Sequence, residues 1–303
     1  MKHYLVLFVA LANWTIIHFH KKIDARENTQ VEIIAPGIIS TNMAEYSPTF
    51  DTNRGELYFM RRTPGVFDYT IYKSKRVESS WTEPEVVSFS GKYRDAAPYL
   101  SPDGNTMYFD SRRPDNRVGE ASINLWYSNR IGEDWNEPQL IAEASVNKEN
   151  EPKVGKDEFG PSVDAQGKLY FYSFRSPLRG GARYSTNIPY SSIMEDDAIP
   201  DPSYNTFVSY LYISPDGKLA ITEGRGKTGS DTDLYYSVKS DDNTWSQSMP
   251  LDNINTVYRE GGPYISPDGK YLFFTSDRPA NQPNASSANL YLIETKDLGI
   301  SYN

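Results

Sequence analysis

The chain has no cysteine among its 303 residues, and its only three histidines lie within the first 20. The first absence excludes disulfide bonds, thiolate nucleophiles, cysteine-ligated zinc and a lipid anchor on cysteine. Removal of the segment that carries His3, His18 and His20 would leave no imidazole, which excludes Ser-His-Asp triads, histidine general bases and histidine-ligated metals. We therefore predict no metal and no cofactor, and any chemistry must come from carboxylates, Tyr, Lys or Arg.

Positive charge is also scarce. The net charge is -9, the isoelectric point is near 5.0, and Lys and Arg are mixed along the chain with Asp and Glu. Nucleic-acid binding requires clustered Lys and Arg, so no nucleic-acid partner is expected.

Sustained 3.6-residue apolar periodicity is missing as well, whereas Tyr (23), Phe (13), Gly (20) and Pro (20) are abundant. These features predict a single all-β domain with little helix.

Residues 1–25 have the layout of an export signal: a short basic start, an apolar stretch from Tyr4 to about Ile17 and a polar exit. Cleavage is expected near Ala25, and an uncleaved anchor is the alternative. The apolar stretch is shorter than the roughly 20 residues of a membrane-spanning helix, so no membrane span is expected in the mature chain. The sequence thus predicts a periplasmic or secreted protein.

A tight turn of the type Ser-Pro-Asp-Gly recurs along the chain. The turn glycines lie 49, 63, 50 and 52 residues apart, at Gly55, Gly104, Gly167, Gly217 and Gly269. Proline and aspartate favour the central positions of such a turn, and glycine accepts the left-handed conformation that closes it. An apolar run lies on either side of each turn, and a third and a fourth run follow, as in a propeller blade. We assign the third run of the middle unit to "NIPYSS" from Asn187.

The two ends of the chain complement each other. The last repeat ends after its third strand, and residues 31–37 precede the first repeat without a partner. We predict that residues 31–37 form the outer strand of the last blade and close the ring. The sequence then describes a monomeric five-bladed propeller over residues 30–297, with a tail at residues 298–303. A sixth blade would have to lie within residues 176–208.

The repeat "SPDGK.L.F.SDR", followed by "NLY" or "NLW", resembles the PD40 or WD40-like repeat of TolB-like propellers. The resemblance covers residues 30–297 and implies a propeller. Propellers of this kind occur as partner-binding modules, as non-catalytic domains of peptidases and in carbohydrate-active proteins. TolB itself has six blades and an added α/β domain, which this chain lacks.

The repeat also places an acid before the inner strand and an arginine after the second strand, at the same end of the hairpin. The acids are Glu45, Asp95, Glu158 and Glu260, and the arginines are Arg62 (or Arg61), Arg113, Arg175, Arg225 and Arg278. Two interpretations stay open: ion pairs that fix the strand ends, or a ligand-binding ring of charge at the channel mouth. Arg225 lacks a repeat acid, which makes it a ligand candidate, and Arg179 is another in a long loop on this face.

The favoured function is an exported, non-catalytic propeller that binds an envelope protein, a peptide or a glycan at the channel mouth. The alternative is a carbohydrate-active hydrolase or lyase that uses channel carboxylates, with Glu158 and Glu260 as the catalytic residues. The acids occupy equivalent repeat positions, which favours a structural role and hence a protein that is not an enzyme.

Overall fold

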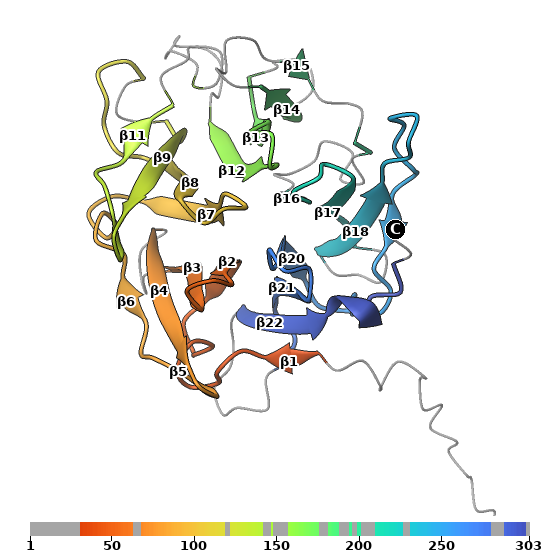
Figure 1. The fold of residues 1–303 in the computed structure, drawn as a ribbon, viewed down its shortest axis with the longest axis horizontal. Helices are drawn as coiled ribbons and strands as arrows, with labels where there is room; N and C mark the ends of the chain where they lie inside the picture. The colour runs from red at the N-terminus through yellow and green to blue at the C-terminus, as the bar shows by residue number, and fades with distance from the viewer. Residues whose placement is uncertain are drawn as a thin grey trace, which may run out of the picture.

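The computed structural model describes residues 31–62, 68–118, 122–141, 147, 157–175, 181–187, 194–195, 199–200, 210–226, 231–279 and 288–300. These residues form five small antiparallel sheets arranged in a ring (Figure 1). Each sheet is one propeller blade, so the predicted all-β, five-bladed fold is confirmed. The export segment at residues 1–25 lies outside the described residues.

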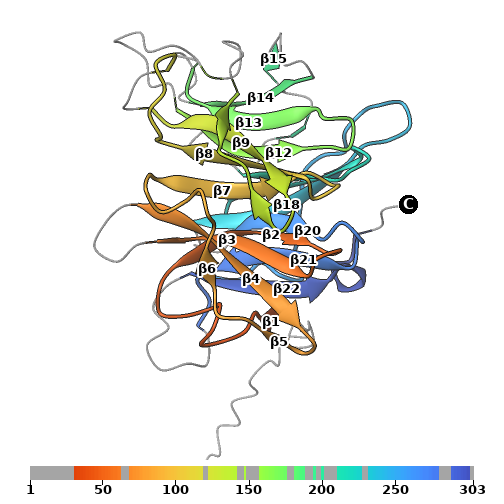
Figure 2. The same cartoon turned by 60° about the vertical axis from the view of Figure 1, so that its left-hand side comes forward.

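Each blade runs outward from the axis in sequence order, with its last strands at the periphery (Figure 1, Figure 2). Blade 1 contains β2 (Glu45–Asp51), β3 (Glu56–Arg62), β4 (Tyr69–Val77), β5 (Ser80–Trp81) and β6 (Glu85–Val86). Blade 2 contains β7 (Asp95–Leu100), β8 (Thr106–Ser111), β9 (Asn124–Ile131), β10 (Asp134–Trp135) and β11 (Gln139–Leu140). Blade 3 contains β12 (Glu158–Val163), β13 (Leu169–Ser173), β14 (Ala182–Thr186) and β15 (Met194–Glu195).

Blade 4 contains β16 (Leu211–Ile213), β17 (Leu219–Arg225), β18 (Thr232–Val238) and β19 (Met249–Pro250). Blade 5 contains β20 (Glu260–Ile265), β21 (Tyr271–Ser276) and β22 (Asn289–Glu294), with β1 (Glu32–Ile33) at its outer edge. A short 3-10 helix, η2 (Thr295–Asp297), follows β22. The inner strands β2, β7, β12, β16 and β20 contact one another in that order, and β20 contacts β2, so the ring is closed.

The repeated turn forms as its residues predict. At the last copy, Gly269 has φ of 72° and its N–H donates to the carbonyl oxygen of Ser266 at 2.8 Å. The hydroxyl of Ser266 donates to Asp268 at 2.6 Å and accepts from the N–H of Tyr271 at 3.0 Å. Four of the turn's own polar groups are thereby paired, which explains why the same four residues recur at three hairpins, those of Gly104, Gly217 and Gly269.

The N-terminal strand closes the last blade as predicted. β1 pairs with β22 in antiparallel register, and the N–H of Ile34 donates to the carbonyl oxygen of Leu290 at 2.9 Å. Ile34 and Ile39 are only 2% and 0% exposed, so this segment also contributes to the core. We call residues 31–40 the latch.

One strand assignment was wrong. The third strand of blade 3 is Ala182–Thr186, where Ala182 pairs with Ser173, and the run from Asn187 follows this strand. Asn187 was chosen because asparagines open other third strands. The structure instead follows burial, because all five residues of β14 are buried against β13 and its neighbours.

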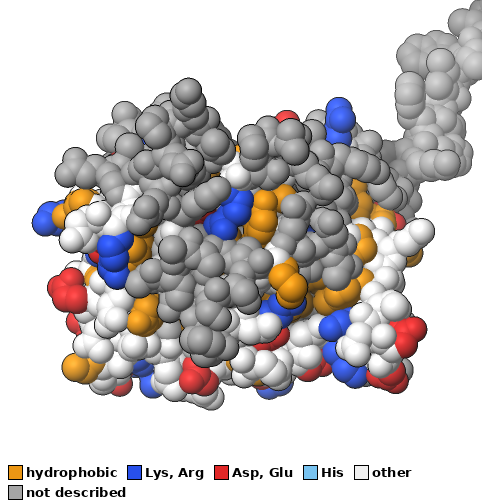
Figure 3. Space-filling view, turned by 90° about the horizontal axis from the view of Figure 1, so that it is seen from above, with side chains coloured by type: hydrophobic (Ala, Val, Ile, Leu, Met, Phe, Trp, Pro, Cys, Tyr) orange, Lys and Arg blue, Asp and Glu red, His pale blue; other side chains and the backbone are white. Residues whose placement is uncertain are grey.

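The described surface carries mixed charge. On the side of the ring seen in Figure 3, acidic and basic side chains are scattered among hydrophobic ones, and neither sign forms a continuous patch there. Among the residues that the structure describes, no helix is long and apolar enough to cross a membrane.

Candidate functional site

The four repeat acids lie in ion pairs at the ends of the inner strands. Each is 0% exposed. The pairs are Glu45 with Arg61 at 3.0 Å, Asp95 with Arg113 at 2.9 Å, Glu158 with Arg175 at 3.1 Å and Glu260 with Arg278 at 3.1 Å. Burial raises the pKa of all four carboxyls, and the arginines oppose that rise. In blade 1 the partner is Arg61 rather than Arg62.

The carboxylate of Glu260 is a fully bonded example, whereas Oε2 of Glu158 is buried without a hydrogen-bond partner among the described residues. Glu260 accepts hydrogen bonds from the N–H and the hydroxyl of Thr256, from the hydroxyl of Ser276 and from Arg278. The group ties together the loop before β20 and the end of β21. Neither Glu260 nor Glu158 lines the two cavities formed by the described residues around the inner strands, so the role of this pair as catalytic residues stays a prediction.

The two remaining arginine candidates differ in position. The register of β17 on β18 places Arg225 one residue before the repeat arginine, at the place that Asp277 takes in blade 5. Its side chain is exposed and makes no ion pair with any part of the chain that the structure describes. Arg179 lies outside the described residues.

The central channel is closed below its mouth by three tyrosines. The ring centroids of Tyr99 and Tyr264 lie 5.5 Å apart, and those of Tyr212 and Tyr264 lie 5.7 Å apart. All three are at most 7% exposed, and only about 20 Å³ of open space remains beside the residues that precede them, Pro98, Leu211 and Pro263. A ligand that enters from the mouth therefore cannot pass these tyrosines.

A second repeat position lies near the end of the second strand of a blade; in blades 2 and 5 it is the last residue but one of that strand. The side chain at this position joins its blade to the next. It contacts a backbone N–H at a bulge in the next inner strand, where φ is positive. The contacts are Met60 to Ala97 at 3.3 Å, Asp110 to Gly160 at 3.3 Å, Glu223 to Gly262 at 2.6 Å and Thr275 to Ser47 at 3.2 Å. A sulfur or a hydroxyl suffices for this contact, so the carboxylates of blades 2 and 4 are departures that need another explanation.

Asp110 is the more enclosed of these two carboxylates. It is 0% exposed, and Arg94 donates to it at 2.5 Å. Arg94 in turn lies over the ring of Tyr69, at 5.4 Å from its centroid. Asp110 therefore acts within the wall of the site, where it holds Arg94 in place.

Glu223 is buried but lies beside a cavity. It lines a cavity of about 130 Å³ at the mouth, whose walls also include Tyr46, Tyr69, Tyr210 and Arg259. Burial raises the pKa of Glu223 to about 7, although the N–H of Gly262 and the charge of Arg259 lower it. A carboxyl with this pKa is partly protonated near neutral pH and can donate a proton.

Asp277 supplies a second, accessible carboxylate. Its Oδ2 lies 3.4 Å from Nε of Arg259, and its side chain is 44% exposed. Arg259 also lies over the ring of Tyr46, 5.0 Å from the centroid, and its charge acts on both Asp277 and Glu223. The mouth thus holds a carboxyl that is easily protonated and an ion-paired carboxylate, and the charge of Arg259 acts on both.

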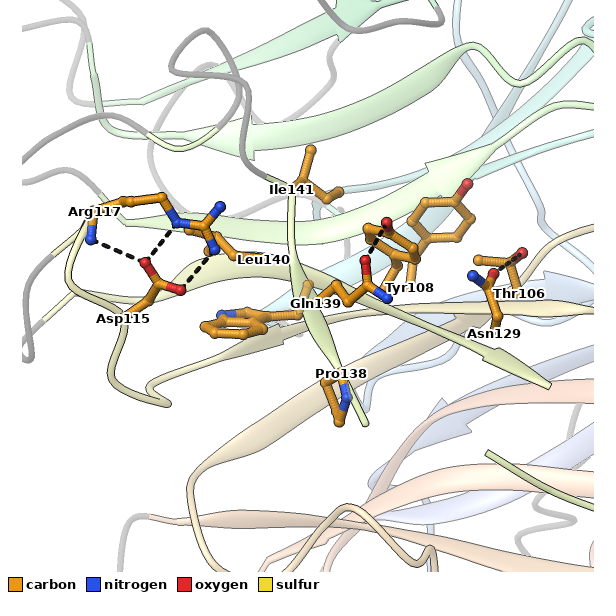
Figure 4. A pocket seen from close by; sticks show the side chains of 11 residues that line it. Thr106, Tyr108, Asp115, Arg117, Asn129, Pro138, Gln139, Leu140 and Ile141 are labelled. Carbon is orange, nitrogen blue, oxygen red and sulfur yellow. Dashed lines mark hydrogen bonds and ion pairs between the residues drawn. The ribbon is translucent and has the colours of Figure 1, made fainter. Parts of the chain in front are cut away.

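A larger groove lies away from the mouth, between β8, β9 and β11. It encloses about 460 Å³, but its polar side chains bond to one another, as Figure 4 shows. Tyr127 donates to Gln139 at 2.9 Å, and two other pairs, Arg117 with Asp115 and Thr106 with Asn129, are satisfied in the same way. Within the described segments, no group of three acidic or imidazole side chains is placed to hold a metal ion.

Comparison with solved structures identifies proteins of the same fold. An α-L-arabinofuranosidase of Podospora anserina, PaAbf62A, matches with a TM-score of 0.51 and 16% identity over 87% of this chain and 96% of its own. Zg3597, a family 117 glycoside hydrolase of Zobellia galactanivorans, matches with a TM-score of 0.51 and 12% identity over 92% and 94%. Arabinanase Arb43A of Bacillus subtilis matches with a TM-score of 0.52 and 12% identity over 84% and 95%. At these identities the likeness establishes the fold.

Neither protein-family models nor curated protein sequences give a match. The propeller implied by the resemblance to PD40 repeats is confirmed, but membership of the PD40 or TolB-like family has no support beyond the repeat residues.

The comparisons contradict the prediction of a non-catalytic binding protein. The three solved propellers described above, which share this fold along most of the chain, are named as an α-L-arabinofuranosidase, a family 117 glycoside hydrolase and an arabinanase, and all three names are those of enzymes. The predicted catalytic residues were acids that repeat from blade to blade, and those acids are buried in ion pairs. Glu223 and Asp277 were not predicted. The sign in the sequence is that each is a carboxylate at a repeat position where another blade has an uncharged or a basic residue.

Proposed function

We propose that this protein is a glycoside hydrolase that works at the channel mouth, with Glu223 as general acid and Asp277 as the second carboxylate. The observation that carries the proposal is the cavity-facing position of Glu223, where burial raises its pKa to about 7. A glycosidase needs one protonated and one ionised carboxyl at the scissile bond. The shared fold with solved glycoside hydrolases supports the same choice.

The roles follow from the contacts. Glu223 donates its proton to the oxygen of the leaving group, and Asp277 acts on the sugar carbon, either directly as a nucleophile or through a water that it activates. Arg259 forms the ion pair that orients Asp277. Tyr46 and Tyr69, whose rings meet edge to face at 5.9 Å, give the sugar an apolar wall.

The test is hydrolysis of polysaccharides and aryl glycosides by the wild type, Glu223→Gln and Asp277→Asn. We expect each replacement to lower kcat about 10²-fold or more on any substrate that the wild type cleaves. Glu83→Gln, at an exposed carboxylate on the outer edge of blade 1, is the matched control and should leave kcat unchanged. Unchanged turnover in Glu223→Gln would exclude this site.

The pH profile tests the acid directly. Because Glu223 must be protonated to act, kcat/KM should fall as the pH rises through about 7. A rate that stays constant from about pH 5 to about pH 9 would contradict the assignment.

We also propose that the enzyme acts outside the cytoplasm, on a glycan of the cell surface or the medium. The composition of residues 1–25 supports this, and N-terminal sequencing of the mature protein tests it.

A further inference from the structure

Arginines gather at the rim of the mouth in equivalent places. On each second strand one position lies opposite the place of the inner acid, and the next residue lies at the rim. This rim residue is Arg62 in blade 1, Arg112 in blade 2 and Arg225 in blade 4. The equivalent residues of the other two blades are Phe174 and Asp277. In blades 1, 2, 3 and 5 the N–H of this residue bonds to the carbonyl just before the inner acid, which confirms the equivalence.

The arginines just before two of the inner acids, Arg94 and Arg259, are paired, whereas two of the rim arginines have no ion pair within the described residues. Arg94 pairs with Asp110, and Arg259 pairs with Asp277. Arg112 and Arg225 are both exposed, and neither forms an ion pair within the described part of the chain. In a protein whose net charge is -9, these two arginines place positive charge at the rim.

The cavity limits how a ligand can lie. About 130 Å³ beside Glu223 admits one end of a ligand, and the tyrosines below it block further entry. The rest of a longer ligand must then cross the rim. Arg112 and Arg225 belong to blades 2 and 4, which blade 3 separates, so they suit charges spaced along a chain better than one small anion.

We infer that the glycan is anionic, and that Arg112 and Arg225 bind its carboxylate or sulfate groups while its terminal sugar lies beside Glu223. Guanidinium groups bind both kinds of anion through paired hydrogen bonds. This inference rests on the proposed function, because it uses the same mouth and the same substrate.

Binding to the Glu223→Gln variant of the full chain tests the inference without turnover. The probes for calorimetry are oligogalacturonate for carboxylates, carrageenan oligosaccharides for sulfates, and xylo-oligosaccharides of equal length as the neutral reference. We expect at least one anionic probe to bind about tenfold more tightly than the neutral one, with an affinity that falls as salt is added.

Replacement of both rim arginines, Arg112→Gln with Arg225→Gln, should then remove most of that preference, by about tenfold or more. The charge-matched control is Lys75→Gln with Arg76→Gln, at exposed positions on β4, and should leave binding unchanged. Equal affinity for neutral and anionic probes, no binding of either anionic probe, or full affinity in the rim variant would each overturn the inference.

The two proposals fail separately. Selective binding of an anionic probe by a protein that cleaves no glycan would overturn the proposed hydrolase alone. Hydrolysis of neutral glycans that depends on Glu223, without any preference for anionic probes, would overturn only the anionic substrate.

Discussion

Replacing Glu223 by glutamine should stabilise this protein at high pH. Burial raises the pKa of Glu223 from its usual 4.5 to about 7, so the folded protein releases this proton later than the unfolded chain does. Between the two values the unfolded chain binds fewer protons, and the free energy of unfolding therefore falls as the pH rises. Glutamine has the shape of the protonated acid and does not titrate.

The size of the effect follows from the same two values. A rise from 4.5 to about 7 corresponds to about 3 kcal/mol, because one pKa unit equals about 1.4 kcal/mol. Glu223 is only 7% exposed, so solvent screening removes little of this. We expect Glu223→Gln and the wild type to be about equally stable near pH 4, and the variant to be more stable by about 3 kcal/mol near pH 9.

Urea unfolding followed by the fluorescence of the five tryptophans measures both free energies. Every other titrating group is common to the two proteins, so their difference isolates residue 223. Glu83→Gln, at an exposed site, should show no such pH-dependent difference. A difference between Glu223→Gln and the wild type that is the same at both pH values would refute the reasoning, and with it the role of Glu223 as an acid near neutral pH.

Two further replacements test the scaffold. Gly160→Ala and Gly132→Ala share the strain of a left-handed residue, at φ of 57° and 59°, but only at Gly160 would the new Cβ lie 2.6 Å from Cδ1 of Tyr210. Denaturant unfolding should therefore show a loss for Gly160→Ala that exceeds the loss for Gly132→Ala by about 1–3 kcal/mol, and equal losses would mean that Tyr210 does not pack there. Ile34→Ala should cost about 2–5 kcal/mol, whereas Ile131→Ala, at a 59% exposed site, should cost less than about 0.5 kcal/mol. Similar losses for the two isoleucines would show that the latch does not close the ring.

The functional site was the part of the protein that the sequence argument located least well. The predicted site consisted mainly of the acids and arginines of the repeat. In the structure these acids, Glu158 among them, lie buried in ion pairs. Glu223 could have been noticed as a carboxylate where blades 1 and 5 have Met60 and Thr275. A departure from a repeat is a better sign of function than the repeat itself, because the scaffold already explains whatever recurs.

The sequence by itself determined the architecture. Turn residues act through local backbone preferences, and their recurrence about every 50 residues fixed the number of hairpins and, with the unpaired segment at residues 31–37, the closure of the ring. Only the tertiary structure decided which charged side chains form ion pairs inside the protein and which face solvent. The charge of Arg259 in blade 5 acts on Glu223 in blade 4, and the cavity wall around Glu223 includes Tyr46 and Tyr69, which are far away in the chain. Such proximity depends on how the blades pack around the axis, which no local pattern records.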